Sequence, residues 1–239
     1  MVIIVRVCGL DIHTPAIVHY YIIMTNLSGR VSERVMCRIG IYLQKQHEMI
    51  VVHPNDPSTK MLSLIYEDIK DVTFFDSRKQ REEILKAIAA APREEPILLL
   101  GHGCPNGLLD MRYGLVIKDE DAGILKDRPN LVGIWCYASS YAYHHGLKGF
   151  FSGMFISEEP EAWVNEVNAE AEEIDEKAWD FAGRFGDMLR EGKPLQEIAA
   201  ELMDSRHQDS ALTRFNYERL TWRPTGEEPL PAASEEENW

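Results

Sequence analysis

The chain is poor in cysteine, in long apolar runs and in positive charge. Its 239 residues include four cysteines without a Cys-x-x-Cys pair, which argues against a disulfide framework and against a zinc knuckle. No apolar run reaches the ~18–20 residues that span a bilayer, and the N-terminal stretch lacks the features of a secretory signal. We therefore expect reduced thiols, a cytoplasmic location and no membrane attachment.

The charge balance and the missing motifs exclude further classes. Lys and Arg number 25 against 39 for Asp and Glu, a net charge of −14. This balance argues against a nucleic-acid binder, because such proteins neutralise phosphates with basic side chains. The chain has no P-loop and no Gly-x-Ser-x-Gly elbow, and Gly101-His-Gly103 lacks the third glycine of a dinucleotide fingerprint.

Strand and helix patterns alternate from about residue 39 onwards. Hydrophobic residues at 45% and charged residues at 27% are ordinary for a globular protein. Short apolar runs alternate with amphipathic segments, which is typical of an α/β domain with a mainly parallel sheet. The expected strands are 49–53, 72–75, 97–100, 131–135, 150–156 and a sixth within 215–222. The expected helices are 58–68 (capped by Ser58), 78–91, 120–127, 139–145, 161–191 with a break near 174–175, and 194–203, and a hairpin is expected within 107–117.

The two ends of the chain differ from its centre. Residues 1–35 carry apolar patches without a clear period, and they are either an extension before a true start at Met36 or an extra strand-and-helix arm. Residues 36–223 are expected to form the α/β domain. Residues 224–239 are rich in proline and glutamate and predict an acidic, disordered tail.

A histidine and a cysteine each follow a buried strand. His102 comes after strand 97–100, and Cys136 comes directly after strand 131–135. Sites in parallel α/β sheets form at the carboxyl ends of the strands, so these two side chains are expected to face one substrate. An imidazole beside a thiol is the minimal set for cysteine nucleophilic catalysis. The backbone N–H groups of Gly103 and Cys136 are the expected oxyanion donors.

The two strand-and-residue patterns together resemble a known family. They read Ile97-Leu-Leu-Leu-Gly-His102-Gly103 and Leu131-Val-Gly-Ile-Trp-Cys136. This arrangement resembles the caspase-like (clan CD) cysteine peptidases, which include caspases, gingipains, clostripains, separases and bacterial CHAT-type domains. The resemblance covers roughly residues 48–160, with looser agreement to 222. Trp135 departs from it, because the family usually has a small residue before its cysteine.

The resemblance carries several expectations. It implies a three-layer α/β/α fold with strand order 2-1-3-4-5-6 and additional C-terminal helices. It implies hydrolysis of a peptide or protein substrate without a metal or an organic cofactor. By the same resemblance the pocket for the P1 residue is built from the loops after strands one and five, which here offer Asp56, Glu158 and Glu159. Carboxylates there would favour an Arg or Lys at P1.

Two other functions remain open at this stage. The chain could be an inactive caspase-like interaction or scaffold module that binds a protein partner through Trp135 and the acidic helical region 161–206. It could also be an unrelated α/β hydrolase or transferase that uses the same strand ends. An activated Cys136 should react with thiol probes faster than Cys104, which is expected to be a packing thiol. The spacing of the nearby His and Cys residues fits no standard zinc site.

Overall fold

The computed structural model describes residues 49–54, 56–76, 81–112 and 114–226 of the chain. The expectations for residues 1–35, and for the expected tail beyond residue 226, lie outside these described residues.

A six-stranded sheet forms the centre of the domain. Numbered along the chain, its strands lie in the order 2-1-3-4-5-6, as expected. The first five run parallel and the last is antiparallel to its neighbour, so the predicted α/β class with a mainly parallel sheet is confirmed. In spatial order the strands are β2 (Val72–Phe75), β1 (Met49–Val52), β3 (Ile97–Leu100), β7 (Leu131–Ile134), β8 (Gly149–Ser152) and β9 (Leu220–Arg223).

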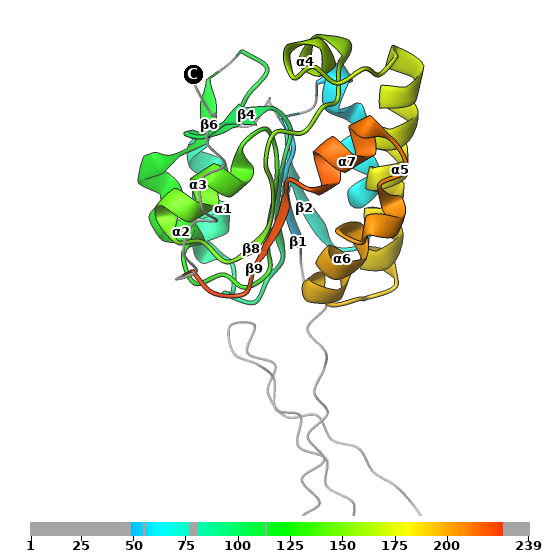
Figure 1. Cartoon of the computed structure of the whole chain (residues 1–239). Coiled ribbons are helices and arrows are strands. Elements are labelled where there is room, and N and C mark those ends of the chain that lie inside the picture. The colour runs from blue at the N-terminus through cyan, green and yellow to red at the C-terminus, as the bar shows by residue number, and fades with distance from the viewer. Residues whose placement is uncertain (1–48, 55, 77–80, 113, 227–239) are drawn as a thin grey trace, which may run out of the picture. The chain divides into compact units, whose positions relative to one another are not determined.

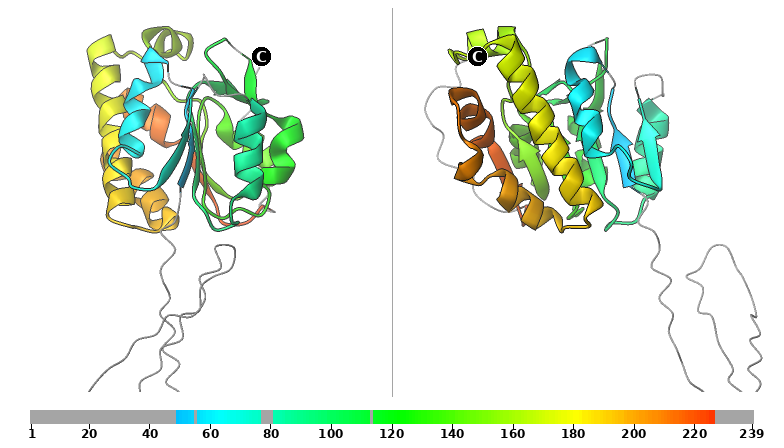
Figure 2. Two further views of the ribbon diagram at one scale, coloured as in Figure 1. Left: turned by 180° about the vertical axis from the view of Figure 1, so that it is seen from behind. Right: turned by 90° about the vertical axis from the view of Figure 1, so that its right-hand side faces the viewer.

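Helices cover both faces of this sheet (Figure 1), and Figure 2 shows the same layers from two further sides. One face carries α1 (Arg81–Ala90), α2 (Ala122–Leu125) and α3 (Ala138–His145). The other face carries the 3₁₀ helix η1 (Pro57–Ile65), α5 (Ala171–Arg190), α6 (Leu195–Leu202) and α7 (Ala211–Tyr217). The remaining short helices are η2 (Asp119–Asp121), α4 (Glu159–Val164) and η3 (Ser205–His207). The domain is therefore built in three layers.

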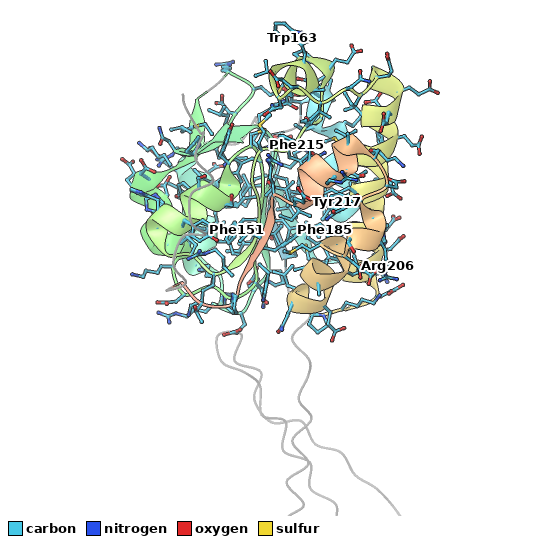
Figure 3. All side chains as sticks on the ribbon, viewed as in Figure 1. Phe151, Trp163, Phe185, Arg206, Phe215 and Tyr217 are labelled. Atoms are coloured by element: carbon cyan, nitrogen blue, oxygen red, sulfur yellow. The ribbon has the colours of Figure 1, made fainter. Side chains whose placement is uncertain are left out.

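Alternate residues of the central strands build a separate hydrophobic core on each side of the sheet. Leu98 packs with residues of η1 and α5, whereas its neighbour Leu99 packs with residues of α1. Both are at most 1% exposed, as expected for a parallel strand that is covered on both faces. Phe151 and Phe185 lie on opposite sides of the sheet (Figure 3). Successive side chains of a strand point to opposite faces of the sheet, so the position of a residue in its strand determines which helices it contacts.

A small second sheet follows β3. Its strands β4 (Gly103–Cys104), β5 (Gly107–Leu109) and β6 (Leu115–Lys118) pair antiparallel. The hairpin expected within 107–117 is confirmed, and β4 adds a strand that the pattern did not indicate. Because β4 begins at Gly103, this sheet holds the segment that directly follows His102.

The expected helix 161–191 is two helices in the structure. The chain leaves helical geometry over residues 165–170, earlier than the expected break near 174–175. Glu166 adopts a left-handed backbone with φ 56°, which turns the chain away after α4. Ile174 lies inside α5 and is 1% exposed, so its apolar contact holds the helix together there.

Two expected strands are shorter than the sequence indicates. In place of the expected strand 150–156 the structure has β8, which ends at Ser152. Only the end of 215–222 is a strand, because Phe215 belongs to α7. Ser210 caps that helix with its side chain, which accepts a hydrogen bond from the Thr213 N–H. The Ser210 cap therefore stabilises a helix in a segment whose apolar pattern would also suit a strand.

A buried histidine joins the end of β1 to η1. His53 is fully buried, and its two ring nitrogens lie 3.0 Å from the Tyr66 hydroxyl and 3.1 Å from Thr59 Oγ1. Burial lowers the pKa of His53 to about 4, so the ring is neutral at neutral pH. The neutral ring donates at one nitrogen and accepts at the other, which suits two hydroxyl partners.

We predict that His53 makes the fold sensitive to acid. The unfolded chain protonates this ring near pH 6.5, whereas the native protein resists protonation until about pH 4. The free energy of unfolding should therefore fall as pH drops through this window, by on the order of 3 kcal/mol from this group. Urea denaturation of wild type and His53→Gln at several pH values measures it. Equal pH slopes in the two proteins would show that His53 has no such role.

Candidate functional site

A cleft of about 760 Å³ opens at the carboxyl ends of the parallel strands, at the end of the sheet where α4 lies (Figure 1). It brings together most of the residues predicted from the sequence, namely Asp56, His102, Gly103, Cys136 and Glu158. Glu159 is the exception, because it lines a neighbouring pocket of about 400 Å³ between η1, α4 and α5. Ser58 and Glu161, which the sequence analysis did not assign to the site, also line the cleft.

Strand register places His102 and Cys136 at equivalent positions. Leu100 of β3 pairs with Ile134 of β7, and His102 and Cys136 each lie two residues beyond that pair. The ladder continues past the strands, since the Gly101 N–H donates to the Ile134 carbonyl at 3.0 Å. The parallel pairing therefore delivers both side chains to the same edge of the sheet.

Trp135 points away from the cleft and supports its floor. The indole is 2% exposed and packs in the core shared with α1 and α3. A Cβ on Gly103 would collide with this ring, so glycine lets the backbone after His102 lie directly on it. The indole N–H also donates to the Cys104 carbonyl at 3.1 Å. Trp135 thus joins the cysteine segment to the histidine segment without entering the site.

The backbone around Cys136 is fixed on both sides. Before it, the Trp135 N–H and carbonyl both bond the buried hydroxyl of Ser152, at 3.0 and 2.8 Å. After it, Tyr137 adopts a left-handed backbone with φ 69°, and its N–H donates to the Gly153 carbonyl at 3.0 Å. A non-glycine residue in this conformation costs about 1–3 kcal/mol and persists where the surroundings impose it. The turn presents Cys136 at the start of α3.

His102 belongs to a hydrogen-bonded group with Ser58 and Asp56. Its Nε2 lies 2.6 Å from Ser58 Oγ and 3.5 Å from Asp56 Oδ1. The Ser58 hydroxyl in turn lies 2.5 Å from the same carboxylate oxygen. Burial would raise the pKa of the Asp56 carboxyl, but the hydrogen bonds from Ser58 and the nearby imidazole outweigh it and hold that pKa below its usual value. Asp56 is therefore an ionised partner of His102 as well as a wall of the cleft.

The role of Ser58 differs from the expected one. Ser58 was predicted to cap an α-helix over 58–68, but the helix is the 3₁₀ helix η1 and Asp56 is its cap. The Asp56 carboxylate accepts from the Ser58 N–H at 2.9 Å. Because Asp56 satisfies the helix end, the Ser58 hydroxyl is left to face His102.

The Cys136 thiol is held as a neutral thiol. Its Sγ lies 3.6 Å from the Phe155 carbonyl and 3.7 Å from Glu161 Oε1. Burial first, and the negative charge of Glu161 second, raise the pKa of Cys136 to about 12. The expectation that His102 stabilises a thiolate is not met in this arrangement, because the imidazole bonds Ser58. Hydrogen bonds between catalytic groups are often long or absent in an empty site, so the contact of His102 with Ser58 does not exclude catalysis by His102 and Cys136.

Glu161 is fixed by the start of α4. Its Oε2 accepts hydrogen bonds from the Ser157 N–H at 2.7 Å and from the Glu158 N–H at 3.2 Å, while Oε1 faces the thiol. Glu161 stands at the third helical position, where an acidic residue closes a capping box. The sequence analysis started this helix at Glu161 itself. The spacing Glu158-x-x-Glu161 fits a capping box, and this pattern could have predicted that the Glu161 side chain turns back toward the preceding loop.

No group of three or more His, Cys, Asp or Glu side chains suited to a metal ion occurs within the described residues. Among the helices that the structure describes, none is both long and apolar enough to cross a membrane.

Comparison with models of known protein families gives no match, and comparison with curated proteins gives none either.

We predict that Cys136 reacts slowly in the native protein. A pKa of about 12 leaves very little thiolate near neutral pH. Its alkylation rate by iodoacetamide should keep rising with pH up to about 10, without a plateau. In concentrated urea the same cysteine should level off near the ordinary thiol pKa of about 8.5. Peptide mapping by mass spectrometry follows the single site. A native plateau below about pH 9 would contradict the burial and charge effects described above.

Proposed function

We propose that this protein is a cysteine endopeptidase of the caspase-like type that cleaves after a basic residue. The observation that carries the proposal is the parallel pairing of β3 and β7, which brings His102 and Cys136 to one cleft. The strand order of the sheet and the chain order of the two residues agree with the caspase-like arrangement. A thiol and an imidazole that share a cleft suit acyl transfer by a covalent intermediate.

The reaction begins with a proton transfer. A bound peptide draws the His102 ring from Ser58 toward the thiol, and the imidazole takes the Cys136 proton. The thiolate attacks the scissile carbonyl carbon, and a C–S bond forms while the carbonyl oxygen becomes an oxyanion. The backbone N–H groups of Gly103 and Cys136 are the proposed donors to that oxygen, and each such donor lowers the barrier by about 3–4 kcal/mol.

The intermediate then collapses to products. His102 returns the proton to the leaving amine, the C–N bond breaks, and an acyl-enzyme remains on Cys136. A water molecule gives its proton to His102 and attacks the acyl carbon, which releases the carboxylate product and restores the thiol. The Asp56 carboxylate is ionised and lies 3.5 Å from Nε2 in the empty site, so its negative charge favours the imidazolium that forms in each half.

Charge in the cleft supports a basic P1 residue. The carboxylates of Asp56, Glu158 and Glu161 line it, and no lysine or arginine lines it within the described residues. A guanidinium or ammonium group would form charge-assisted hydrogen bonds there. Glu159 lies outside the cleft, so Glu161 takes its place beside Asp56 and Glu158 among the proposed P1 carboxylates.

A non-catalytic interaction module is the second candidate. One observation favours it: Trp163 and Val164 on α4 are 82% and 69% exposed, and Figure 3 shows Trp163 pointing outward from α4. Exposed apolar side chains of this size can mark a protein-binding surface. Such a module would bind its partner equally well without the Cys136 thiol.

Fluorogenic peptides with Arg, Lys, Asp or Leu at P1 test the proposal. We expect cleavage of the Arg and Lys peptides, with losses of at least about a thousandfold in Cys136→Ala and His102→Ala. Ser58→Ala is the matched control for a serine nucleophile on the same histidine, and it should retain cleavage. Activity that survives in Cys136→Ala but not in Ser58→Ala would overturn the cysteine mechanism. Equal cleavage after an Arg-to-Asp exchange at P1 would overturn the charge argument.

A further inference from the structure

Glu161 holds the nucleophile and lines the substrate cleft at the same time. One carboxylate oxygen is fixed by backbone N–H groups at the start of α4, so the side chain cannot swing away. The other oxygen, Oε1, lies 3.7 Å from Cys136 Sγ, and both residues line the cleft. Because Oε2 already accepts from two backbone N–H groups, Oε1 is the oxygen that remains for a cation in the cleft.

We infer that Glu161 couples substrate choice to nucleophile activation: a guanidinium or ammonium side chain that pairs with Glu161 replaces the thiol at Oε1 and frees Cys136 for deprotonation by His102. This inference rests on the proposed function and deepens it. The carboxylate is then more than a specificity group. It keeps the empty site inactive, and the correct substrate removes that block.

The carboxylates around the Cys136 thiol all disfavour its deprotonation. Glu161 on α4 is the nearest, and the Glu158 and Asp56 carboxylates line the same cleft from the β8–α4 loop and from the residue before η1. Among the described residues that line the cleft, His102, from the loop after β3, is the one whose side chain can carry positive charge, and it bonds Ser58. A substrate cation adds the opposite charge within a few ångströms of the sulfur, which favours the thiolate.

The coupling predicts how side chains at P1 differ. An Arg or Lys at P1 neutralises Glu161 and allows the proton to leave Cys136. A Leu at P1 leaves the carboxylate charged and facing the sulfur, so the thiol stays protonated even when the peptide is bound. An Asp at P1 adds a further negative charge. The preference for a basic residue should consequently appear in kcat as well as in KM.

Methylguanidinium, which reproduces the end of an arginine side chain, tests the coupling without any peptide. The measured quantity is the alkylation rate of Cys136 by iodoacetamide at fixed pH and ionic strength, followed by peptide mapping. In wild type we expect methylguanidinium to raise this rate about threefold or more. A thiol pKa lowered by one unit gives tenfold more thiolate, partly offset by its lower nucleophilicity. Sodium chloride at equal ionic strength should have no such effect, and Cys104 in the same digest should not change.

Glu161→Gln separates charge from shape. A glutamine at this helical position can still accept from the backbone and close the capping box, so the fold should be kept. The variant should alkylate at Cys136 about threefold to tenfold faster than wild type without the cation, and methylguanidinium should no longer accelerate it. Glu159→Gln makes the same charge change on the same helix outside the cleft, and it should behave as wild type.

The outcomes distinguish this inference from the proposed function. If methylguanidinium does not accelerate alkylation in wild type, or accelerates it equally in Glu161→Gln, the coupling is wrong, whatever the peptides show. If the acceleration occurs and depends on Glu161, but no Cys136-dependent peptide cleavage is found, the coupling stands and the peptidase proposal fails. Should Glu161→Gln not fold, a wild type that shows no acceleration by methylguanidinium still overturns the coupling.

Discussion

The parallel pairing of β3 with β7 is the constraint on which the site depends. It aligns Leu100 with Ile134, and the residues two positions beyond each of them are His102 and Cys136. Burial of both strands on both faces makes the register hard to shift, because a slip by one residue would exchange the two cores. Trp135 also connects the segment that carries Cys136 to the segment after His102. Its ring packs against Gly103, and its indole N–H donates a hydrogen bond to the Cys104 carbonyl. The distance between the two reactive segments is thus set by packing that lies outside the cleft.

Carboxylates hold each member of the proposed catalytic pair apart from the other. Asp56 and Ser58 hold the His102 ring, and Glu161 holds the Cys136 thiol. Both carboxylates are themselves fixed by backbone N–H groups at the starts of η1 and α4. The empty site consequently keeps Cys136 as a neutral thiol beside a carboxylate, and the proposed cationic substrate is the group that best disturbs this contact. A cysteine with a pKa raised to about 12 is therefore compatible with the proposed catalytic role.

Local pattern was enough to predict the sheet and the placing of His102 and Cys136 in one cleft, and three-dimensional packing decided the rest. Apolar runs such as 97–100 and 131–135 could only be buried strands, and the residues after them therefore lay at one edge. Glu161 was missed because its role depends on where α4 begins, which Pro160 and the capping box set. Ser58 was assigned to a helix cap because its contact with His102 spans 44 residues of sequence and arises only when η1 packs against the sheet. The bend at 165–170 depended on a left-handed Glu166, which carries no glycine signal.

The most direct test of this account is a crystal structure of the protein treated with a short peptide aldehyde that ends in argininal. The account predicts a covalent bond from Cys136 Sγ to the aldehyde carbon, with the new oxygen at the Gly103 N–H. It also predicts the guanidinium on Glu161 and the His102 ring turned from Ser58 toward the adduct. An adduct on Ser58, or a guanidinium bound away from Glu161 while Cys136 keeps its contact with that carboxylate, would contradict it.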